Sequence, residues 1–172
     1  PHRIEHLQMA RPEDLDVLSK LKNTVVTCQP NNLSLDISMI ETCAGERARY
    51  AYPLKSIINT GIPVMLGSDA PVADKNPLAG IYSAVARRRM DFTPKQGWHM
   101  EQALHVDDAV KGYTICAAIG SGTSDVLGSI TSGKFADLVV LDRNIFEIDP
   151  WEILKTKVDI TIFNGKVVHD RG

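Results

Sequence analysis

The strongest constraint on the fold is an alternation of short apolar runs with helical segments in the larger, N-terminal part of the chain. Residues 24–29 (TVVTCQ) form a β-branched run, which is typical of a strand buried on both faces. Residues 62–66 form a second such run. Between the two runs, Pro53 can open a helix that ends at Gly61. This order of strand, helix and strand predicts a βαβ unit, and therefore a parallel sheet of the α/β class.

Further segments carry apolar residues at helical spacing. They predict helices over residues 12–22, 78–90 and 107–119. The second of these helices ends in Arg87, Arg88 and Arg89. We expect these side chains to cover a solvated helix end, where positive charge suits the helix dipole. Binding of phosphate or nucleic acid by the arginines is the alternative, and a net charge of -2 disfavours it.

The sequence pattern changes beyond Ser124 to short strand-like runs. These runs cover residues 127–130, 136–141, 158–163 and 166–169. Asn164-Gly165 stands between the last two, and this dipeptide is the strongest short signal for a β-hairpin. We therefore expect a small antiparallel sheet that is separate from the parallel one. The predicted domains are residues 1–122 and 123–172.

Length and charge exclude several classes of protein. A chain of 172 residues is too short for a complete (β/α)8 barrel, which takes roughly 250. The charge balance offers no basic field for nucleic acid, and no apolar run reaches the roughly 20 residues of a membrane span. We therefore expect neither nucleic acid nor a membrane as a partner. The chain starts at Pro1 without a methionine or a signal peptide, so we expect a fragment.

The cysteines indicate a reducing compartment. Cys28, Cys43 and Cys116 show neither disulfide-framework nor zinc-site spacing. We expect each to be a small buried apolar side chain, in a protein of the cytoplasm.

Two side chains are candidates for chemistry. His6 ends a potential strand, and Asp69 follows the buried run 62–66. Their separation along the chain suits two βα units of roughly 30 residues each, so both would lie at the same rim of a parallel barrel. Imidazole and carboxylate are suitable ligands for a zinc-like cation, which lowers the pKa of bound water toward about 7. Asp69 could also take the proton of that water and pass it to a leaving amine.

A structural interpretation of both residues stays open. A histidine near a chain end is often a surface residue, and Ser-Asp before a proline is common in turns. The histidines His99, His105 and His169 are expected at the surface, because none of them belongs to an H-x-H or HExxH pair.

Several short motifs follow one another along the chain. They are Arg3-Ile4-Glu5-His6, Gln29-Pro30, Gly67-Ser68-Asp69-Ala70-Pro71-Val72, residues 128–142 (GSITSGKFADLVVLD) and Asn164-Gly165-Lys166-Val167-Val168. In this order they resemble the C-terminal part of the amidohydrolase superfamily, in the branch that includes N-substituted formamide deformylases. The resemblance runs from about residue 2 to residue 170, and the set of motifs carries it rather than any single one.

The resemblance implies the C-terminal portion of a (β/α)8 TIM barrel, with strands 6 to 8 and their helices, followed by a segment of a small antiparallel β-sandwich. Proteins of this family use a divalent metal to hydrolyse amide or other C-N bonds. By resemblance, His6 is the metal ligand that ends strand 6, and Asp69 is the strand 8 residue that binds metal and shuttles protons. Gln29 and Asn31, at the mouth of strand 7, are candidate residues for binding a small amide-like substrate.

The chain also departs from the family pattern. The H-x-H pair of strand 1, the bridging lysine or acid of strand 4 and the histidine of strand 5 have no counterpart. Only His6 and Asp69 remain as ligands, so we expect the isolated chain to hold zinc weakly or not at all and to be inactive. A barrel sheet that starts at strand 6 leaves open edges, which predicts self-association or a missing N-terminal part. The main hypothesis is a piece of a metal-dependent hydrolase, and the alternative is a non-catalytic remnant or assembly module.

Overall fold

The computed structural model describes all residues, 1–172. Its elements follow in the order β1 (His2–Glu5), α1 (Pro12–Leu18), β2 (Thr24–Cys28), α2 (Pro30–Cys43), the 3-10 helix η1 (Gly45–Tyr50), α3 (Leu54–Asn59), β3 (Val64–Leu66), α4 (Pro77–Ala86), η2 (Met100–Gln102), α5 (Val106–Tyr113), α6 (Ile115–Ser121), β4 (Leu138–Leu141), η3 (Pro150–Lys155), β5 (Val158–Phe163) and β6 (Lys166–Asp170). Helix follows strand in the first part, and the last strands follow one another with only η3 between them.

The first three strands form a parallel sheet in the order β1-β2-β3. The central strand β2 pairs on both sides, and its Val25, Val26 and Cys28 are at most 1% exposed. Burial on both faces explains why this strand has consecutive apolar residues instead of alternating ones. The predicted parallel sheet is confirmed.

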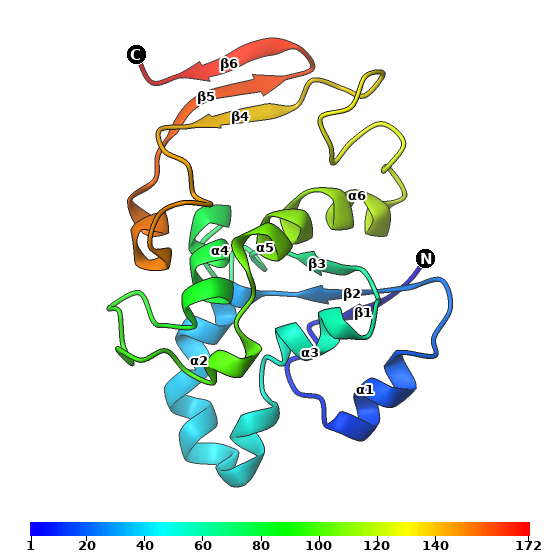
Figure 1. Ribbon diagram of the computed structural model, residues 1–172, viewed down its shortest axis with the longest axis vertical. Coiled ribbons are helices and arrows are strands. Elements are labelled where there is room, and N and C mark those ends of the chain that lie inside the picture. Colours follow the sequence, from blue (N-terminus) through cyan, green and yellow to red (C-terminus); the bar gives the residue numbers. More distant parts are fainter.

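The last three strands form a separate antiparallel sheet in the order β4-β5-β6. It lies at one end of the molecule, and α5 and α6 separate it from the parallel sheet (Figure 1). Asn164 and Gly165 have positive φ angles of 48° and 74°, as a tight hairpin turn requires, so the predicted hairpin is confirmed. Residues 127–130 were expected to be a strand and are not: Gly128 has a φ of 87° and packs against the backbone of Ile115.

The longest helix, α2, was not expected from the sequence. Pro30 occupies its first turn, and its buried apolar residues Leu33, Ile37 and Ile40 recur at helical spacing. Leu35 and Met39, on the same helix, are exposed. Apolar residues on both faces obscure the amphipathic pattern from which a helix is usually recognised.

Other helix boundaries differ from the predictions. Helix α1 ends at Leu18, four residues before the expected end at Lys22. The helix expected over residues 107–119 is two helices, because the backbone of Thr114 leaves the helical region with φ -118° and ψ -95°. Helix α4 ends at Ala86, since Arg87 takes the left-handed conformation with φ 47°.

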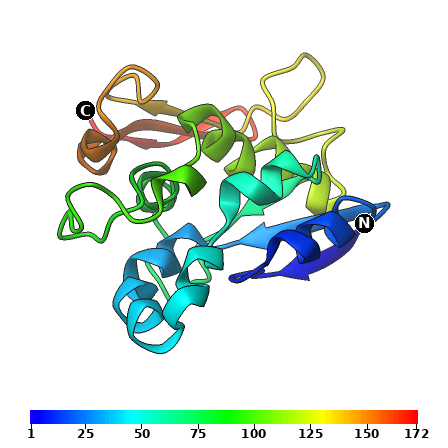
Figure 2. The same cartoon turned by 60° about the horizontal axis from the view of Figure 1, so that its bottom comes forward.

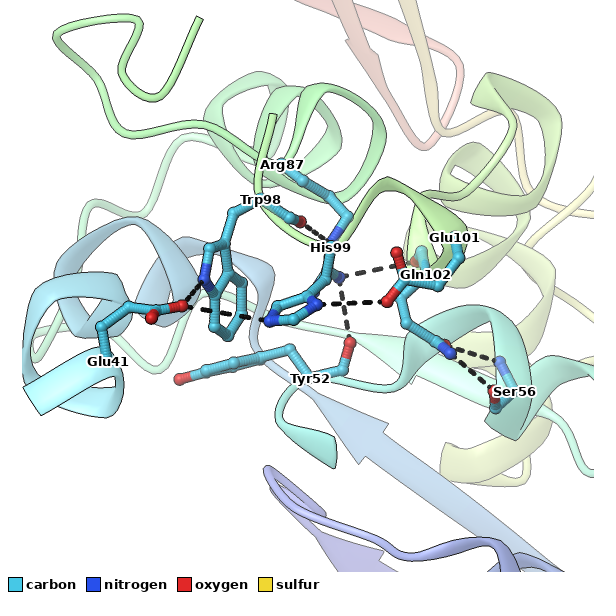
Figure 3. A network of polar contacts seen from close by, with 8 residues as sticks. All are labelled: Glu41, Tyr52, Ser56, Arg87, Trp98, His99, Glu101 and Gln102. Atoms are coloured by element: carbon cyan, nitrogen blue, oxygen red, sulfur yellow. Dashed lines mark hydrogen bonds and ion pairs between the residues drawn. The ribbon is translucent and has the colours of Figure 1, made fainter. Parts of the chain in front are cut away.

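Arg87 is buried, so its expected place at a solvated helix end is wrong. Its side chain is completely inaccessible, and it donates hydrogen bonds to the carbonyl oxygens of Trp98 (2.7 Å) and Tyr52 (2.9 Å) (Figure 3). Burial lowers the pKa of its guanidinium to about 10, so the group stays charged at neutral pH. The left-handed turn explains the difference, because it directs Arg87 inward while Arg88 and Arg89 stay partly exposed.

Two glycines let α5 and α6 approach β3 closely. A Cβ atom at Gly112 would collide with the side chain of Leu66, and one at Gly120 would collide with that of Met65. The helices therefore pack directly on this short strand, within the main hydrophobic core. Figure 2 shows the same arrangement from a second side, with the N-terminal strand at one margin of the parallel sheet. No helix in the structure is both long enough and apolar enough to cross a membrane.

The cysteines differ in exposure. Cys28 is buried, Cys116 is half-buried and Cys43 is exposed, so the expectation of burial is wrong for Cys43. The reason is its position in the last turn of α2, away from the buried face of that helix. Burial raises the pKa of the Cys28 thiol to about 12.

We predict that a thiol reagent such as DTNB labels the folded chain fastest at Cys43, since the reactive thiolate forms readily only where the thiol is accessible. The Cys43→Ser variant should lose the fast phase. Peptide mass mapping should find Cys28 unmodified until denaturant is added. A fast phase that survives in Cys43→Ser would contradict the assignment.

Candidate active site

The candidate site lies where the parallel strands end. His6 follows β1, Gln29 follows β2 and Asp69 comes three residues after β3. Because the three strands run in parallel and pair in register, their carboxyl ends meet at one edge of the sheet. This is the edge at which α/β folds place their ligands.

His6 and Asp69 line one cavity of about 390 Å³. Its other lining residues are Gln8, Asn32, Leu35, Asp36 and Val72. The backbones of His6 and Asp69 have positive φ angles of 69° and 59°. Such conformations cost non-glycine residues about 1–3 kcal/mol and concentrate at functional sites. Seven other non-glycine residues, among them Arg87 and Asn164, also have positive φ angles, so these angles describe the two turns and do not identify the site.

Asn32 joins the site through Asp69. Its Nδ2 donates a hydrogen bond to Asp69 Oδ2 at 3.2 Å. Its Oδ1 is buried and has no hydrogen-bond partner. A buried amide oxygen without a partner is uncommon. This oxygen is almost inaccessible, so Asn32 acts at the site through the hydrogen bond that it donates to Asp69.

The two other residues predicted for this site lie outside the cavity. Gln29 is 6% exposed and does not line the cavity, and its Oε1 is buried without a partner. Asn31 lines a neighbouring cavity of about 450 Å³ and donates a hydrogen bond to the backbone carbonyl of Asp74 at 2.6 Å. Their proposed role in substrate binding stays a prediction.

Helix α2 supplies three of the five cavity residues that the sequence did not predict, and the other two are Gln8 and Val72. Asn32, Leu35 and Asp36 are spaced as positions i, i+3 and i+4, so they share one face of the helix, and that face lines the cavity. In the sequence, the Gln29-Pro30 motif marks the start of this helix. The residues that face the cavity can be selected only after the helix itself has been predicted.

Tyr52 connects two lining residues behind the cavity. Its hydroxyl donates to Asp36 Oδ2 at 2.5 Å and accepts a hydrogen bond from Gln8 Nε2 at 2.9 Å. Tyr52 is only 2% exposed. Burial, followed by the Asp36 carboxylate, raises the pKa of the phenol above its usual value, so the hydroxyl stays protonated and acts as the donor.

The donor types fit a divalent cation, but their number does not complete a site. Imidazole and carboxylate are both common zinc ligands. No group of at least three His, Cys, Asp or Glu side chains could hold a metal ion in this chain. His6 and Asp69 can therefore form only part of a metal centre.

Three further histidines lie away from this cavity. His105 and His169 are exposed, as expected. His99 is half-buried, with Nδ1 at 3.2 Å from Glu101 and Nε2 at 3.9 Å from Glu41 (Figure 3). None of them lines the cavity that contains His6 and Asp69.

Solved structures similar to this chain include metal-dependent hydrolases. An uncharacterized metal-dependent hydrolase from Pyrococcus horikoshii has a TM-score of 0.74 and 26% identity, over 87% of this chain and 30% of that one. An adenosine deaminase from Xanthomonas campestris with bound zinc has a TM-score of 0.68 over 98% of this chain and 37% of that one, and at 15% identity the likeness is one of fold alone. The chain thus has a mixed α/β fold that is similar to about a third of each of these solved structures.

Sequence relatives identify the family. A family model described as "Amidohydrolase family" matches residues 1–169. The putative amidohydrolase YtcJ of Bacillus subtilis is 29% identical over 170 residues, which are 98% of this chain and 32% of that protein. The N-substituted formamide deformylase of Arthrobacter pascens is 33% identical over 120 residues, or 70% of this chain and 22% of that protein. The chain belongs to the amidohydrolase family and spans about a third or less of the length of these relatives.

We predict that Tyr52→Phe lowers the free energy of unfolding by about 1–2 kcal/mol, because Asp36 and Gln8 lose their buried partner. Tyr50→Phe is the matched control, since the Tyr50 ring is partly exposed and its hydroxyl makes no hydrogen bond. Urea denaturation of both variants measures the difference. Equal midpoints would show that the Tyr52 hydroxyl contributes nothing to stability.

Proposed function

We propose that this chain is part of a metal-dependent amidohydrolase that hydrolyses amide or other C-N bonds, with His6 and Asp69 among its metal ligands. The observation that carries the proposal is the single cavity that both side chains line, at the carboxyl ends of parallel strands. Membership of the amidohydrolase family supports the reaction class.

We further propose that β1, β2 and β3 are strands 6, 7 and 8 of a (β/α)8 barrel. Residues 123–172 would then contribute the C-terminal strands of a small β-sandwich, and residues 1–122 the barrel segment. The parallel order of β1 to β3 and the separate antiparallel sheet support this assignment. So does the fraction of the solved hydrolases that the chain covers, 30% and 37%.

In this proposal each residue of the cavity has a chemical role. His6 and Asp69 would hold the cation, for which we propose zinc, and the cation would supply Lewis acidity and a water of lowered pKa. Asp69 takes a proton from the attacking water and passes it to the departing nitrogen. Asn32 orients the Asp69 carboxylate through its hydrogen bond. Overall, water is added across the C-N bond, and a carboxylic acid and an amine are released.

The remaining ligands would come from outside these residues. Strands β1 and β3 each pair only with β2, so the sheet has an unpaired edge on both sides. Such edges favour pairing with another strand. We propose that the rest of the protein, or self-association, covers them, and that the isolated chain has little or no activity. The free cysteines are the basis for proposing a cytoplasmic location.

A non-catalytic assembly module is the second candidate. The lack of a three-ligand group within this chain favours it. The gene sequence that precedes the codon for Pro1 separates the two candidates. An H-x-H pair after a predicted strand in the preceding sequence would support the enzyme. A start codon immediately before the codon for Pro1 would support the module.

We predict that Asp69→Asn lowers kcat of the full-length protein by about 10²- to 10⁴-fold, because the amide cannot accept and transfer the proton. Circular dichroism should show an unchanged fold. Asp16→Asn, an exposed substitution on α1, should keep wild-type turnover. Wild-type turnover in Asp69→Asn would exclude this residue from the mechanism.

We also predict that His6→Ala lowers the metal content per chain of the full-length protein, since one ligand is lost. Elemental analysis after gel filtration measures this content. His105→Ala removes an exposed histidine and should leave the metal content unchanged. Equal metal content in the wild type and both variants would contradict the ligand assignment.

A further inference from the structure

Asp36 is a third ionisable side chain at the candidate active site. It lines the same cavity as His6 and Asp69 and comes from the helix that also supplies Asn32. Neither metal binding nor proton transfer in the proposed mechanism uses it. Its position beside the reacting groups suggests contact with the substrate.

The Asp36 carboxylate is held by a buried support. Tyr52 donates its hydroxyl hydrogen bond to Oδ2 of Asp36, and Gln8 Nε2 donates to that hydroxyl. The Tyr52 backbone is fixed as well, because its N-H donates to the Gln8 carbonyl at 2.6 Å and its carbonyl accepts from Arg87 at 2.9 Å. Figure 3 shows the Tyr52 phenol pointing away from Arg87. These contacts join segments that are far apart in the sequence, and they fix the position of Oδ2 of the Asp36 carboxylate.

The other Asp36 oxygen is available to a ligand. Tyr52 hydrogen-bonds to Oδ2, and Oδ1 has no hydrogen bond within the protein. A carboxylate accepts hydrogen bonds at both oxygens, and bonds to a charged acceptor are stronger than neutral ones. A ligand in this cavity with an N-H group would therefore find an oriented acceptor.

Charge and surface character indicate the kind of substrate. Besides the proposed metal ligands His6 and Asp69, the cavity wall has one charged side chain, Asp36, and no lysine or arginine that could pair with an anionic substrate. Leu35 and Val72 are 60% and 68% exposed, and both also line the neighbouring cavity that contains Asn31. They offer apolar surface next to the polar site. An uncharged amide with an apolar substituent matches both properties.

We propose that Asp36 binds the substrate by accepting a hydrogen bond from the N-H of an uncharged secondary amide, and that Tyr52 and Gln8 are its positioning residues. This assignment rests on the proposed hydrolase function. It adds a specificity: secondary amides should be bound better than tertiary amides, which lack the N-H.

The test uses the full-length, metal-loaded protein with two amides, formanilide and N-methylformanilide. They differ at the nitrogen, where the second compound carries a methyl group in place of hydrogen. The wild type should show a KM about 10- to 100-fold lower for formanilide, as expected for a hydrogen bond to a charged acceptor. The assay measures the released amine, which is aniline from formanilide and N-methylaniline from N-methylformanilide.

Asp36→Asn is the main variant. Tyr52 would keep the Asn carbonyl oxygen as its acceptor, so the NH2 group would face the substrate and place a donor against a donor. KM for formanilide should rise about 10- to 100-fold while kcat changes less than about threefold, and KM for N-methylformanilide should stay the same. Tyr52→Phe should raise KM for formanilide by a smaller factor. Asp16→Asn is the matched control.

The outcomes are distinguishable. Equal KM values for both amides in the wild type, or an unchanged KM for formanilide in Asp36→Asn, would overturn the assignment of Asp36 and leave the hydrolase proposal intact. Loss of bound metal in Asp36→Asn would also overturn it, by making Asp36 a ligand. A wild type that hydrolyses neither amide would overturn this inference, and full turnover in Asp69→Asn would instead overturn the proposed mechanism.

Discussion

The parallel pairing of β2 with β1 and β3 is the interaction on which the rest of the structure depends. It aligns three strand ends at one edge, and the turns that leave this edge carry His6, Gln29 and Asp69. The pairing is stable because β2 is buried on both faces, which removes its apolar side chains from water and leaves its backbone groups paired. Without this alignment, His6 and Asp69 would remain distant residues of a long chain.

The elements predicted from the sequence are those whose signal is local. The β-branched run of β2 and the Asn164-Gly165 turn depend on a few neighbouring residues, and both were found as predicted. Helix α2 and the inward direction of Arg87 depend on distant segments. The buried apolar residues of α2 pack in one cluster with Tyr52 and Trp98. Arg87 donates hydrogen bonds to the carbonyls of Trp98 and Tyr52, while its buried Nη2 has no partner. Local patterns cannot reveal partners that only the tertiary fold brings near.

The residues of the candidate site also differ in whether a local signal predicts them or only the tertiary fold reveals them. His6 and Asp69 could be selected in advance, because imidazole and carboxylate near strand ends are a chemical signal, and the structure brings them to one cavity. Asn32 and Asp36 could not, since their place depends on the face of a helix that was not predicted. Family membership supports the hydrolase proposal, and the different hydrogen-bond partners of Asp69 and Asp36 are the basis for proposing separate roles for them.

The glycines of α5 and α6 have a consequence for how this protein can evolve. Gly112 and Gly120 lie against Leu66 and Met65, and the chain runs from Leu66 through a short turn to Asp69. A methyl group at Gly112 would meet Leu66 close to its backbone and push α5 away from β3, whereas one at Gly120 would meet the flexible end of the Met65 side chain, which can move aside. Substitutions should therefore be tolerated less at Gly112 than at Gly120, although neither glycine lines the cavity that contains His6 and Asp69.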